Sequence, residues 1–358
     1  MSLLSAETSV SLPDPLSIVD AFEDHFSEHL EMEREGATVR FKAEYGHGSF
    51  SAEGGRFAAS VSCISEHILM SVKAMVAEHI VEFSGETGLD FRWSGHGAQQ
   101  RELPNLFVGE VARAYNLTPH MRRLVVSVES GIERLLTGGM HVRLLLVPDQ
   151  ARAPVWPYLA PTGAIVWPAN DDLLTRRVYT IRSGDIARGE VDIDFVMHEG
   201  DHMPGATFGA TAKPGDVVGI IGPSGTCPEA DRYVFAGDET ALPVMLRMAA
   251  EMPAGKMLRV YAEIDDEAER QEIVCAANVE WTWLYRRGKP AGTTGLIEKA
   301  LRDHAWSADH EGLHVFVACE KSEARAAKSF LTDEIALPKA ALRAVGYWTM
   351  GVAETTDR

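Results

Sequence analysis

The chain has 358 residues, 46% of them apolar and 24% charged, which is enough material for two or three globular domains. Its formal net charge of -18 repels phosphates, so we expect neither nucleic acid nor an anionic membrane surface as a partner. The four cysteines lie far apart without a C-x-x-C pair, which argues against an iron–sulfur cluster, a zinc site or a disulfide framework.

The first residues, 1–16, contain no basic segment followed by an apolar one, and no stretch of the chain has the length needed to span a bilayer. We therefore expect a protein without membrane insertion in a reducing, cytoplasmic setting.

Residues 1–95 are predicted to form a small α+β domain. Apolar residues recur at helical spacing over 14–33, residues 37–43 and 48–62 have the pattern of strands, and 65–83 returns to a helical period. The polar, Gly-containing stretch 94–105 has the composition of a linker.

Two histidines of the first helix are spaced to share one face. His25 and His29 stand at i and i+4, a spacing that a metal site can use. Such spacings also arise often without a metal, so we favour a solvated or core-edge pair and predict no metal site.

Residues 103–227 are predicted to form an antiparallel β-barrel. Six segments between 108 and 225 have the composition of short strands separated by turns, with almost no long helical period among them. The longest irregular stretch, 149–174, is rich in Pro and Trp, and loops of this length often cover a site.

Residues 228–358 alternate between strand and helix. The strands at 232–237, 257–264, 279–285, 313–319 and 342–348 surround helical patterns at 239–252, 294–306 and 322–335. Such alternation predicts a mostly parallel α/β sheet of the nucleotide-binding kind.

A short motif on one predicted barrel strand suits a flavin. In Arg177-Val178-Tyr179-Thr180, the period of two places Arg177 and Tyr179 on one face and Thr180 on the other. A guanidinium can bind a pyrophosphate, a phenol ring can stack on an isoalloxazine, and a threonine can bind flavin N5. By itself the tetrapeptide is more often an ordinary strand surface than a flavin site.

The motifs that follow carry a family resemblance. R-x-Y-T, D-F-V-x-H, G-A-T and K-P-G-D, in this order and spacing, resemble the FAD-binding segment of siderophore-interacting proteins. The resemblance runs from about Phe107 to Gly351 and includes GDETALP from Gly237 and the C-terminal GYWTMG. It implies a ferredoxin-reductase-like fold, bound FAD, and reduction of Fe(III) in a ferric siderophore to Fe(II) with release of the iron. Residues 1 to about 93 loosely resemble a small domain of unknown function associated with iron-uptake proteins.

The same resemblance implies the cofactor-binding residues. They are Arg177, Val178, Tyr179 and Thr180 on the strand, Val196, His198, Gly205, Ala206 and Thr207 at the following turn, and Glu239, Thr240 and Ala241 in GDETALP. The turn matches because backbone amides at a helix start bind phosphate well. For His198 the alternative is a strand-end histidine with a structural partner.

GDETALP stands where a dinucleotide fold turns from its first strand into its first helix, but it is no G-x-G-x-x-G fingerprint. A helix N-cap by Asp238 or Thr240 is an equally weighted interpretation. The acids Glu263, Asp265 and Asp266 at the end of the next strand disfavour a 2′-phosphate, which favours NADH over NADPH as electron donor, although solvated loop acids have the same appearance. Ferredoxin stays open as a donor.

Many iron chelates are anionic, so basic groups in an acidic protein are candidate substrate contacts. Arg286, Arg287 and Lys289 form the densest basic group, although solvated turn residues have the same appearance. Tyr347 and Trp348 either close the flavin pocket or pack on the sheet, and we favour packing.

The sequence thus predicts a flavin-dependent ferric-siderophore reductase. A general NAD(P)H flavin reductase, or a ferredoxin-linked electron-transfer flavoprotein, is one alternative. A siderophore-binding protein without catalysis is the other.

Overall fold

The computed structural model describes residues 3–27, 30–86, 88–197 and 204–352. Its contacts divide the chain into two compact units. Unit 1 comprises residues 1–106 together with 153–173, and unit 2 comprises 107–152 together with 174–358.

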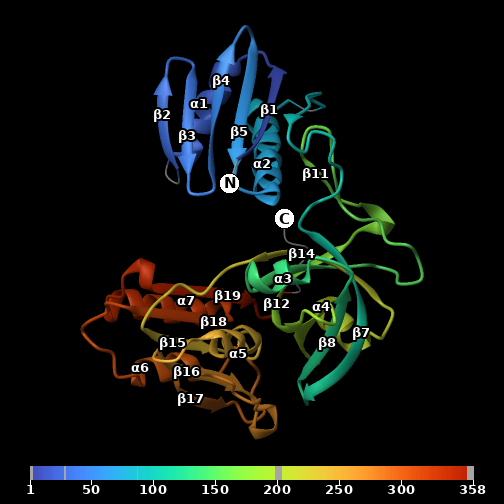
Figure 1. Ribbon diagram of the computed structural model, residues 1–358. Helices are drawn as coiled ribbons and strands as arrows, with labels where there is room; N and C mark the ends of the chain where they lie inside the picture. The colour runs from blue at the N-terminus through green and yellow to red at the C-terminus, as the bar shows by residue number, and fades with distance from the viewer. Residues whose placement is uncertain (1–2, 28–29, 87, 198–203, 353–358) are drawn as a thin grey trace. The chain divides into compact units, whose positions relative to one another are not determined.

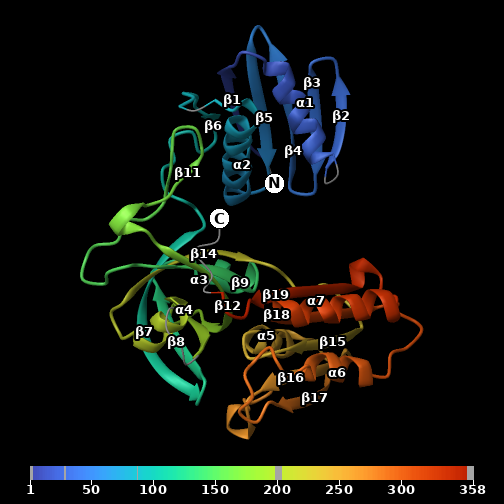
Figure 2. The same cartoon turned by 180° about the vertical axis from the view of Figure 1, so that it is seen from behind.

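Unit 1 is an antiparallel sheet with two helices on one face (Figures 1 and 2). The strand order is β2-β3-β4-β5-β1-β6. The helices are α1 (Pro15–Phe26) and α2 (Glu66–Ser84), and the strands are β1 (Leu4–Ser11), β2 (Glu31–Glu35), β3 (Thr38–Ala43), β4 (Gly46–Glu53), β5 (Arg56–Cys63) and β6 (Ser94–Gly95). Alternate residues of β5 are buried under the helices because side chains of a strand point to opposite faces in turn.

Three details of unit 1 differ from the sequence prediction. The first helix ends at Phe26 instead of reaching residue 33, because residues 31–35 pair with β3 as a strand. The predicted strand 48–62 is two strands joined at Gly54-Gly55, where both residues have positive φ of 58° and 74° and close a hairpin. The strand β1 was not predicted.

The first part of unit 2 is a closed barrel with the order β12-β13-β8-β7-β14-β9. The pairings β12–β13, β13–β8, β8–β7, β14–β9 and β9–β12 are antiparallel, as predicted. Its elements are β7 (Leu106–Thr118), β8 (Met121–Val128), α3 (Ile132–Thr137), β9 (His141–Leu146), β12 (Thr175–Asp185), β13 (Glu190–Val196), α4 (Pro204–Thr211) and β14 (Val217–Ser224).

The second part of unit 2 is a parallel five-stranded sheet with the order β17-β16-β15-β18-β19, also as predicted. One core packs α5 on one side of the sheet, and another packs α6 and α7 on the other. The elements are β15 (Arg232–Gly237), α5 (Leu242–Glu251), β16 (Met257–Ile264), a 3₁₀ turn η2 (Glu267–Glu269), β17 (Asn278–Tyr285), α6 (Leu296–Asp303), β18 (Leu313–Glu320), α7 (Lys321–Ser329), a π turn η3 (Phe330–Glu334), a 3₁₀ turn η4 (Lys339–Ala341) and β19 (Leu342–Trp348).

The Pro- and Trp-rich segment 153–173 groups with unit 1 and not with the barrel that it interrupts. It contains the two-stranded hairpin β10 (Tyr158–Leu159) and β11 (Ile165–Val166) and the 3₁₀ turn η1 (Asn170–Asp172). The boundaries 1–95, 103–227 and 228–358 stay a prediction. Over the described ranges, no helix is long and apolar enough to cross a membrane.

Candidate flavin and substrate site

The strand β12 presents the R-x-Y-T motif as the alternation of side chains predicts. It pairs with β9 in antiparallel register, with Thr180 opposite His141. The Tyr179 ring packs on Phe195 with their centroids 4.2 Å apart, while Val178 on the other face is 55% exposed. Burial raises the pKa of the Tyr179 hydroxyl well above its usual range, so this phenol stays protonated and able to donate.

The start of α4 lies against this strand. A Cβ at the buried Gly205 would overlap the Tyr179 hydroxyl and lie 3.6 Å from Arg177 Cγ, so only glycine permits this approach. Arg177, Tyr179 and Gly205 therefore meet at one place, beside the first backbone amides of an eight-residue helix. A guanidinium, a ring with a hydroxyl and a helix N-terminus suit the pyrophosphate and the isoalloxazine of FAD.

The other predicted residues of the turn that the structure describes lie at the end of β13 and in the first turn of α4. Val196 ends β13, Ala206 is half-buried and the Thr207 side chain is exposed in the first turn of α4. His198 lies outside the described residues, and so does His29 of the predicted histidine pair. The His25 ring packs against His79 of α2, 4.9 Å between centroids, and the described residues contain no group of three or more His, Cys, Asp or Glu suited to a metal.

Thr180 connects the barrel to the α/β part through His141. Thr180 is buried, and its Oγ1 lies 3.5 Å from His141 Nδ1. The His141 ring meets Tyr347 of β19 edge-on, 6.2 Å between centroids. Burial and the nearby cations of Arg343 and Arg247 lower the pKa of His141 to about 4, so its imidazole is neutral at pH 7.

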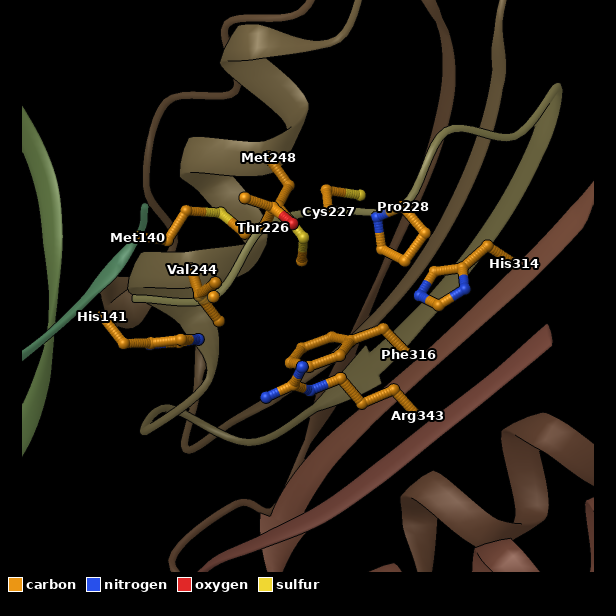
Figure 3. Close-up of a pocket in the computed structure, with 11 residues that line it drawn as sticks. Met140, His141, Thr226, Cys227, Pro228, Val244, Met248, His314, Phe316 and Arg343 are labelled. Carbon is orange, nitrogen blue, oxygen red and sulfur yellow. The ribbon is translucent and has the colours of Figure 1, made fainter. Parts of the chain in front are cut away.

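A pocket opens beside His141 in unit 2 (Figure 3). Its apolar wall includes Met140, Met248 and Phe316, and its polar groups include His141, His314 and Arg343. Among the described residues, the lining contains no carboxylate, and Arg343 is exposed. With a volume of about 10 Å³ the pocket holds no more than a water molecule, so in a chain with net charge -18 the feature that suits an anion is the exposed Arg343 of its lining.

The GDETALP turn is held by Asp238, which is 1% exposed. Its carboxylate accepts from Thr240 N at 2.9 Å, from Thr240 Oγ1 at 2.5 Å and from Trp348 Nε1 at 2.8 Å. The N-cap of α5 is Ala241 and has no side-chain cap, so Asp238 stabilises the turn that precedes the helix and does not cap it. Trp348 is fixed by this bond on the sheet edge, as the packing interpretation expects.

Glu239 of this turn forms a buried ion pair with Arg286. Its carboxylate lies 2.6 Å from the Arg286 guanidinium, and Glu263 lies 3.7 Å from the same group. Glu239, Arg286 and Glu263 are all buried, with exposures of 4%, 8% and 0% respectively. Arg286 is thus neutralised inside the protein, and in this structure it offers no charge to an external chelate.

The neighbouring predicted residues remain accessible. Arg287 and Lys289 are exposed, and Arg287 lies 5.9 Å from the centre of the Tyr285 ring. Glu263 cannot meet a ribose, because it is fully buried and accepts from Thr294 Oγ1 at 2.8 Å. Asp265 accepts from Gly288 N and Asp266 from Ala268 N, so both acids shape their own loops.

Sequence reasoning missed His141, Arg343 and Arg247. Arg343 stands at the start of β19, within a strand pattern that carries no local mark of a site. His141 is the first residue of the apolar strand β9 and gains its importance only through the register that pairs it with Thr180. A basic residue facing a carboxylate-free pocket is a signal that only the fold supplies.

Comparison with known proteins matches three segments of the chain to protein families. Residues 110–227 match the model of the siderophore-interacting FAD-binding domain, 230–351 match that of the siderophore-interacting protein, and 7–94 match an uncharacterised domain conserved in bacteria. Over 219 residues the chain is 28% identical to the ferric vibriobactin reductase of Vibrio cholerae, covering 60% of this chain and 79% of the relative.

Two solved structures are similar over most of their length. A siderophore utilization protein from T. fusca is 31% identical with a TM-score of 0.55, covering 70% of this chain and 96% of that one. The siderophore-interacting protein SipS from Aeromonas hydrophila is 26% identical with a TM-score of 0.58, covering 69% and 93%. With both of its later domains matched in order, the chain belongs to the siderophore-interacting protein family.

Proposed function

We propose that this protein is a ferric-siderophore reductase that uses bound FAD to convert chelated Fe(III) to Fe(II) and so releases the iron. The observation that carries the proposal is the meeting of Arg177, Tyr179 and Gly205 beside the start of α4. The ferric vibriobactin reductase and the ferric acinetobactin reductase of Acinetobacter baumannii, each 28% identical over the matched residues, support the same reaction class.

The protein's own part in the reaction is positioning and electrostatics. FAD, when bound, supplies a carrier that takes two electrons together and passes them singly to iron. Arg177 would bind the pyrophosphate and Tyr179 would support the ring system, while the buried Thr180, whose Oγ1 lies 3.5 Å from neutral His141, would offer a hydroxyl from the other face of the strand. No side chain needs to act as a nucleophile.

The surface around exposed Arg343, beside the pocket at His141, is the proposed docking place of the chelate, because the pocket itself holds no more than a water molecule. Arg343 supplies a positive charge at an apolar wall, so an anionic ferric chelate is attracted to the region beside Thr180 and Tyr347. Arg287 and Lys289, both exposed, add charge at the edge of the sheet. Arg286 is left out of this role because Glu239 neutralises it.

For the electron donor we propose NADH, since Asp265 and Asp266, which follow β16, disfavour a 2′-phosphate. NADPH and reduced ferredoxin are the alternatives to compare. A donor assay with all three at equal reducing equivalents separates them, because only the physiological donor should reduce the bound flavin rapidly.

The deciding experiment is the visible spectrum of the purified protein, followed by NADH and a ferric siderophore with a ferrous indicator. We expect flavin absorbance that bleaches with donor and then yields Fe(II). Arg177→Ala and Tyr179→Ala should lose flavin while remaining folded, whereas Ile186→Ala, an exposed position in the turn between β12 and β13, should retain it. A colourless protein that binds no added FAD would refute the proposal, and equal rates with unchelated acceptors would favour a general flavin reductase.

A further inference from the structure

The start of α5 is the place where a dinucleotide fold commonly binds phosphate, through backbone amides that point out of the helix. In this chain those amides are already used or absent. Thr240 N donates to the Asp238 carboxylate at 2.9 Å. Ala241 N and Leu242 N donate to Asp238 O at 3.0 Å and 3.1 Å. The next residue, Pro243, has no N–H.

The same turn is buried and negatively charged. Asp238 and Glu239 are 1% and 4% exposed, and Arg286 is neutralised by Glu239 and Glu263. A diphosphate placed here would lose its hydration and meet two carboxylates, which is unfavourable. A donor that carries phosphates is therefore expected to bind them elsewhere along the carboxyl edge of the sheet.

Two exposed arginines lie after the two neighbouring strands, and both contact one aromatic ring. Arg270 follows η2 behind β16, and Arg287 follows β17. Their guanidinium carbons lie 5.3 Å and 5.9 Å from the centre of the Tyr285 ring. Parallel pairing of β16 with β17 brings these two loops together at the carboxyl edge. Over the described ranges, neither arginine forms an ion pair with a carboxylate.

The backbone at Arg287 is held in an uncommon conformation. Its φ is 57°, in the left-handed region that residues other than glycine rarely adopt. Arg287 N donates to Asp265 O at 2.9 Å, and Gly288 N donates to the Asp265 carboxylate at 2.7 Å. The loop after β16 thus fixes the direction in which Arg287 leaves the sheet. Strained backbone that is held by such bonds is concentrated at functional positions.

The backbone at Arg270 is anchored as well. The preceding residue, Glu269, is 3% exposed and accepts from Thr118 Oγ1 at 2.5 Å and from His120 N at 3.0 Å. These bonds tie the loop after β16 to the turn between β7 and β8. Both arginines are therefore presented from fixed backbone, which lowers the entropy that a ligand must overcome on binding.

Tyr285 adds an unusual buried group to this place. Its hydroxyl is buried and has no hydrogen-bond partner within the described part of the chain. Such orphaned groups are rare in folded proteins, and a phosphate oxygen would supply the missing partner. Three nearby acids are already engaged, because Asp265 and Glu269 accept the bonds given above and Asp266 accepts from Ala268 N at 2.8 Å.

We propose that Arg270, Tyr285 and Arg287 form a phosphate site that binds the diphosphate of a nicotinamide donor, in place of the start of α5. Guanidinium groups bind phosphate oxygens through paired, charge-assisted hydrogen bonds. In a chain of net charge -18, two exposed arginines on one ring are a local positive patch. This site rests on the nicotinamide donor proposed above and names the residues that hold it.

The test is the binding of ADP to the full chain by isothermal titration calorimetry, because ADP carries the diphosphate without redox chemistry. Arg270→Gln and Arg287→Gln should each raise the dissociation constant of ADP about tenfold, since each removes a charge-assisted contact. Tyr285→Phe should raise it by a smaller factor. Arg325→Gln removes the same charge from an exposed position of α7 and should bind ADP like the wild type. Thermal unfolding verifies that each variant is folded.

A second probe, 2′,5′-ADP, carries the phosphate that distinguishes NADPH from NADH. Tighter binding of 2′,5′-ADP than of ADP, lost in Arg270→Gln and Arg287→Gln, would overturn the diphosphate assignment and give the site to a 2′-phosphate. A wild-type protein that binds no ADP, or a double variant of both arginines that binds it equally well, would overturn the phosphate site altogether.

Steady-state kinetics give an independent readout. Arg270→Gln should raise the KM for NADH about tenfold and leave the KM for a ferric siderophore unchanged. An unchanged KM for NADH would contradict the site. Binding of ADP needs neither flavin nor iron, so a protein without FAD would refute the reductase while the calorimetry still decided whether the phosphate site exists.

Discussion

Arg247 of α5 donates from Nη1 to the carbonyl oxygen of Ile181, the residue after Thr180, at 2.8 Å. Its Nη2 donates to Leu136 O at 2.7 Å and its Nε to Glu251 at 2.7 Å. The Arg247 side chain is 5% exposed. One buried guanidinium thus joins the α/β part of unit 2 to the strand that carries the flavin motif.

Removal of this guanidinium should destabilise unit 2. Arg247→Ala leaves two buried carbonyl groups without a donor, so the free energy of unfolding in urea should fall by about 3 kcal/mol. The free energy of unfolding of Arg247→Lys should lie between those of the wild type and the Ala variant, because an ammonium group cannot reproduce the planar arrangement of guanidinium donors. An Ala variant as stable as the wild type would show that these bonds contribute nothing net.

Gly205→Ala should weaken flavin binding. The added methyl group overlaps the Tyr179 hydroxyl and must displace it or the start of α4. We expect the dissociation constant of FAD to rise about tenfold, equivalent to about 1.4 kcal/mol. Ala210→Ser, at an exposed position of the same helix, is the control and should bind like the wild type. Equal affinities in the two variants would place the flavin elsewhere.

Arg286 and Arg287 should behave differently although they are adjacent. Arg286→Ala leaves Glu239 and Glu263 buried without their counter-charge, which should lower the free energy of unfolding by about 3–5 kcal/mol. Arg287→Ala changes an exposed side chain, and its effect should stay within about 0.5 kcal/mol. Thermal unfolding of the two variants measures the contrast, and a stable Arg286→Ala protein would contradict the buried ion pair.

Glu263 should make stability depend on pH. Burial raises its pKa from 4.5 to about 7, against the opposing hydrogen bond from Thr294 and the charge of Arg286. The folded protein therefore binds this proton more tightly than the unfolded chain does, and the associated stability is present below pH 4.5 and lost as pH rises through about 7.

Glu263→Gln removes this titration and retains an acceptor for Thr294. Relative to the wild type, the variant should gain stability between pH 5 and pH 8, by up to about 3 kcal/mol at 1.36 kcal/mol for each pKa unit. Urea titrations across this range measure the difference, with exposed Glu267→Gln as control. A constant difference between variant and wild type would show that Glu263 does not titrate there.

Much of the fold is predictable because local patterns report burial directly. The alternation in 176–183 placed Arg177 and Tyr179 together, and the strand–helix order after 228 predicted the parallel sheet. Errors arose where one pattern has two explanations. Residues 31–33 continue a helical period but pair as a strand, since a neighbouring strand supplies bonds that a period cannot reveal.

The substrate residues show the limit most clearly. Arg286, Arg287 and Lys289 are alike in the sequence, yet Arg286 turns inward because parallel register brings the ends of β15, β16 and β17 together with Glu239 and Glu263. Arg343 lies far along the chain from His141 and lines the same pocket. Contacts between residues so distant in the sequence depend on the order of the strands in the sheet, and no short sequence pattern predicts that order.

The amino-acid sequence by itself determined the order of barrel and α/β parts, the R-x-Y-T strand and the family resemblance, because these depend on residue types at short spacing. The tertiary structure alone decided which charges are neutralised, which line a pocket, and that residues 153–173 belong with the N-terminal unit. The physical reason is that burial of a charge or of a loop is set by what packs against it, and that partner is remote in the chain.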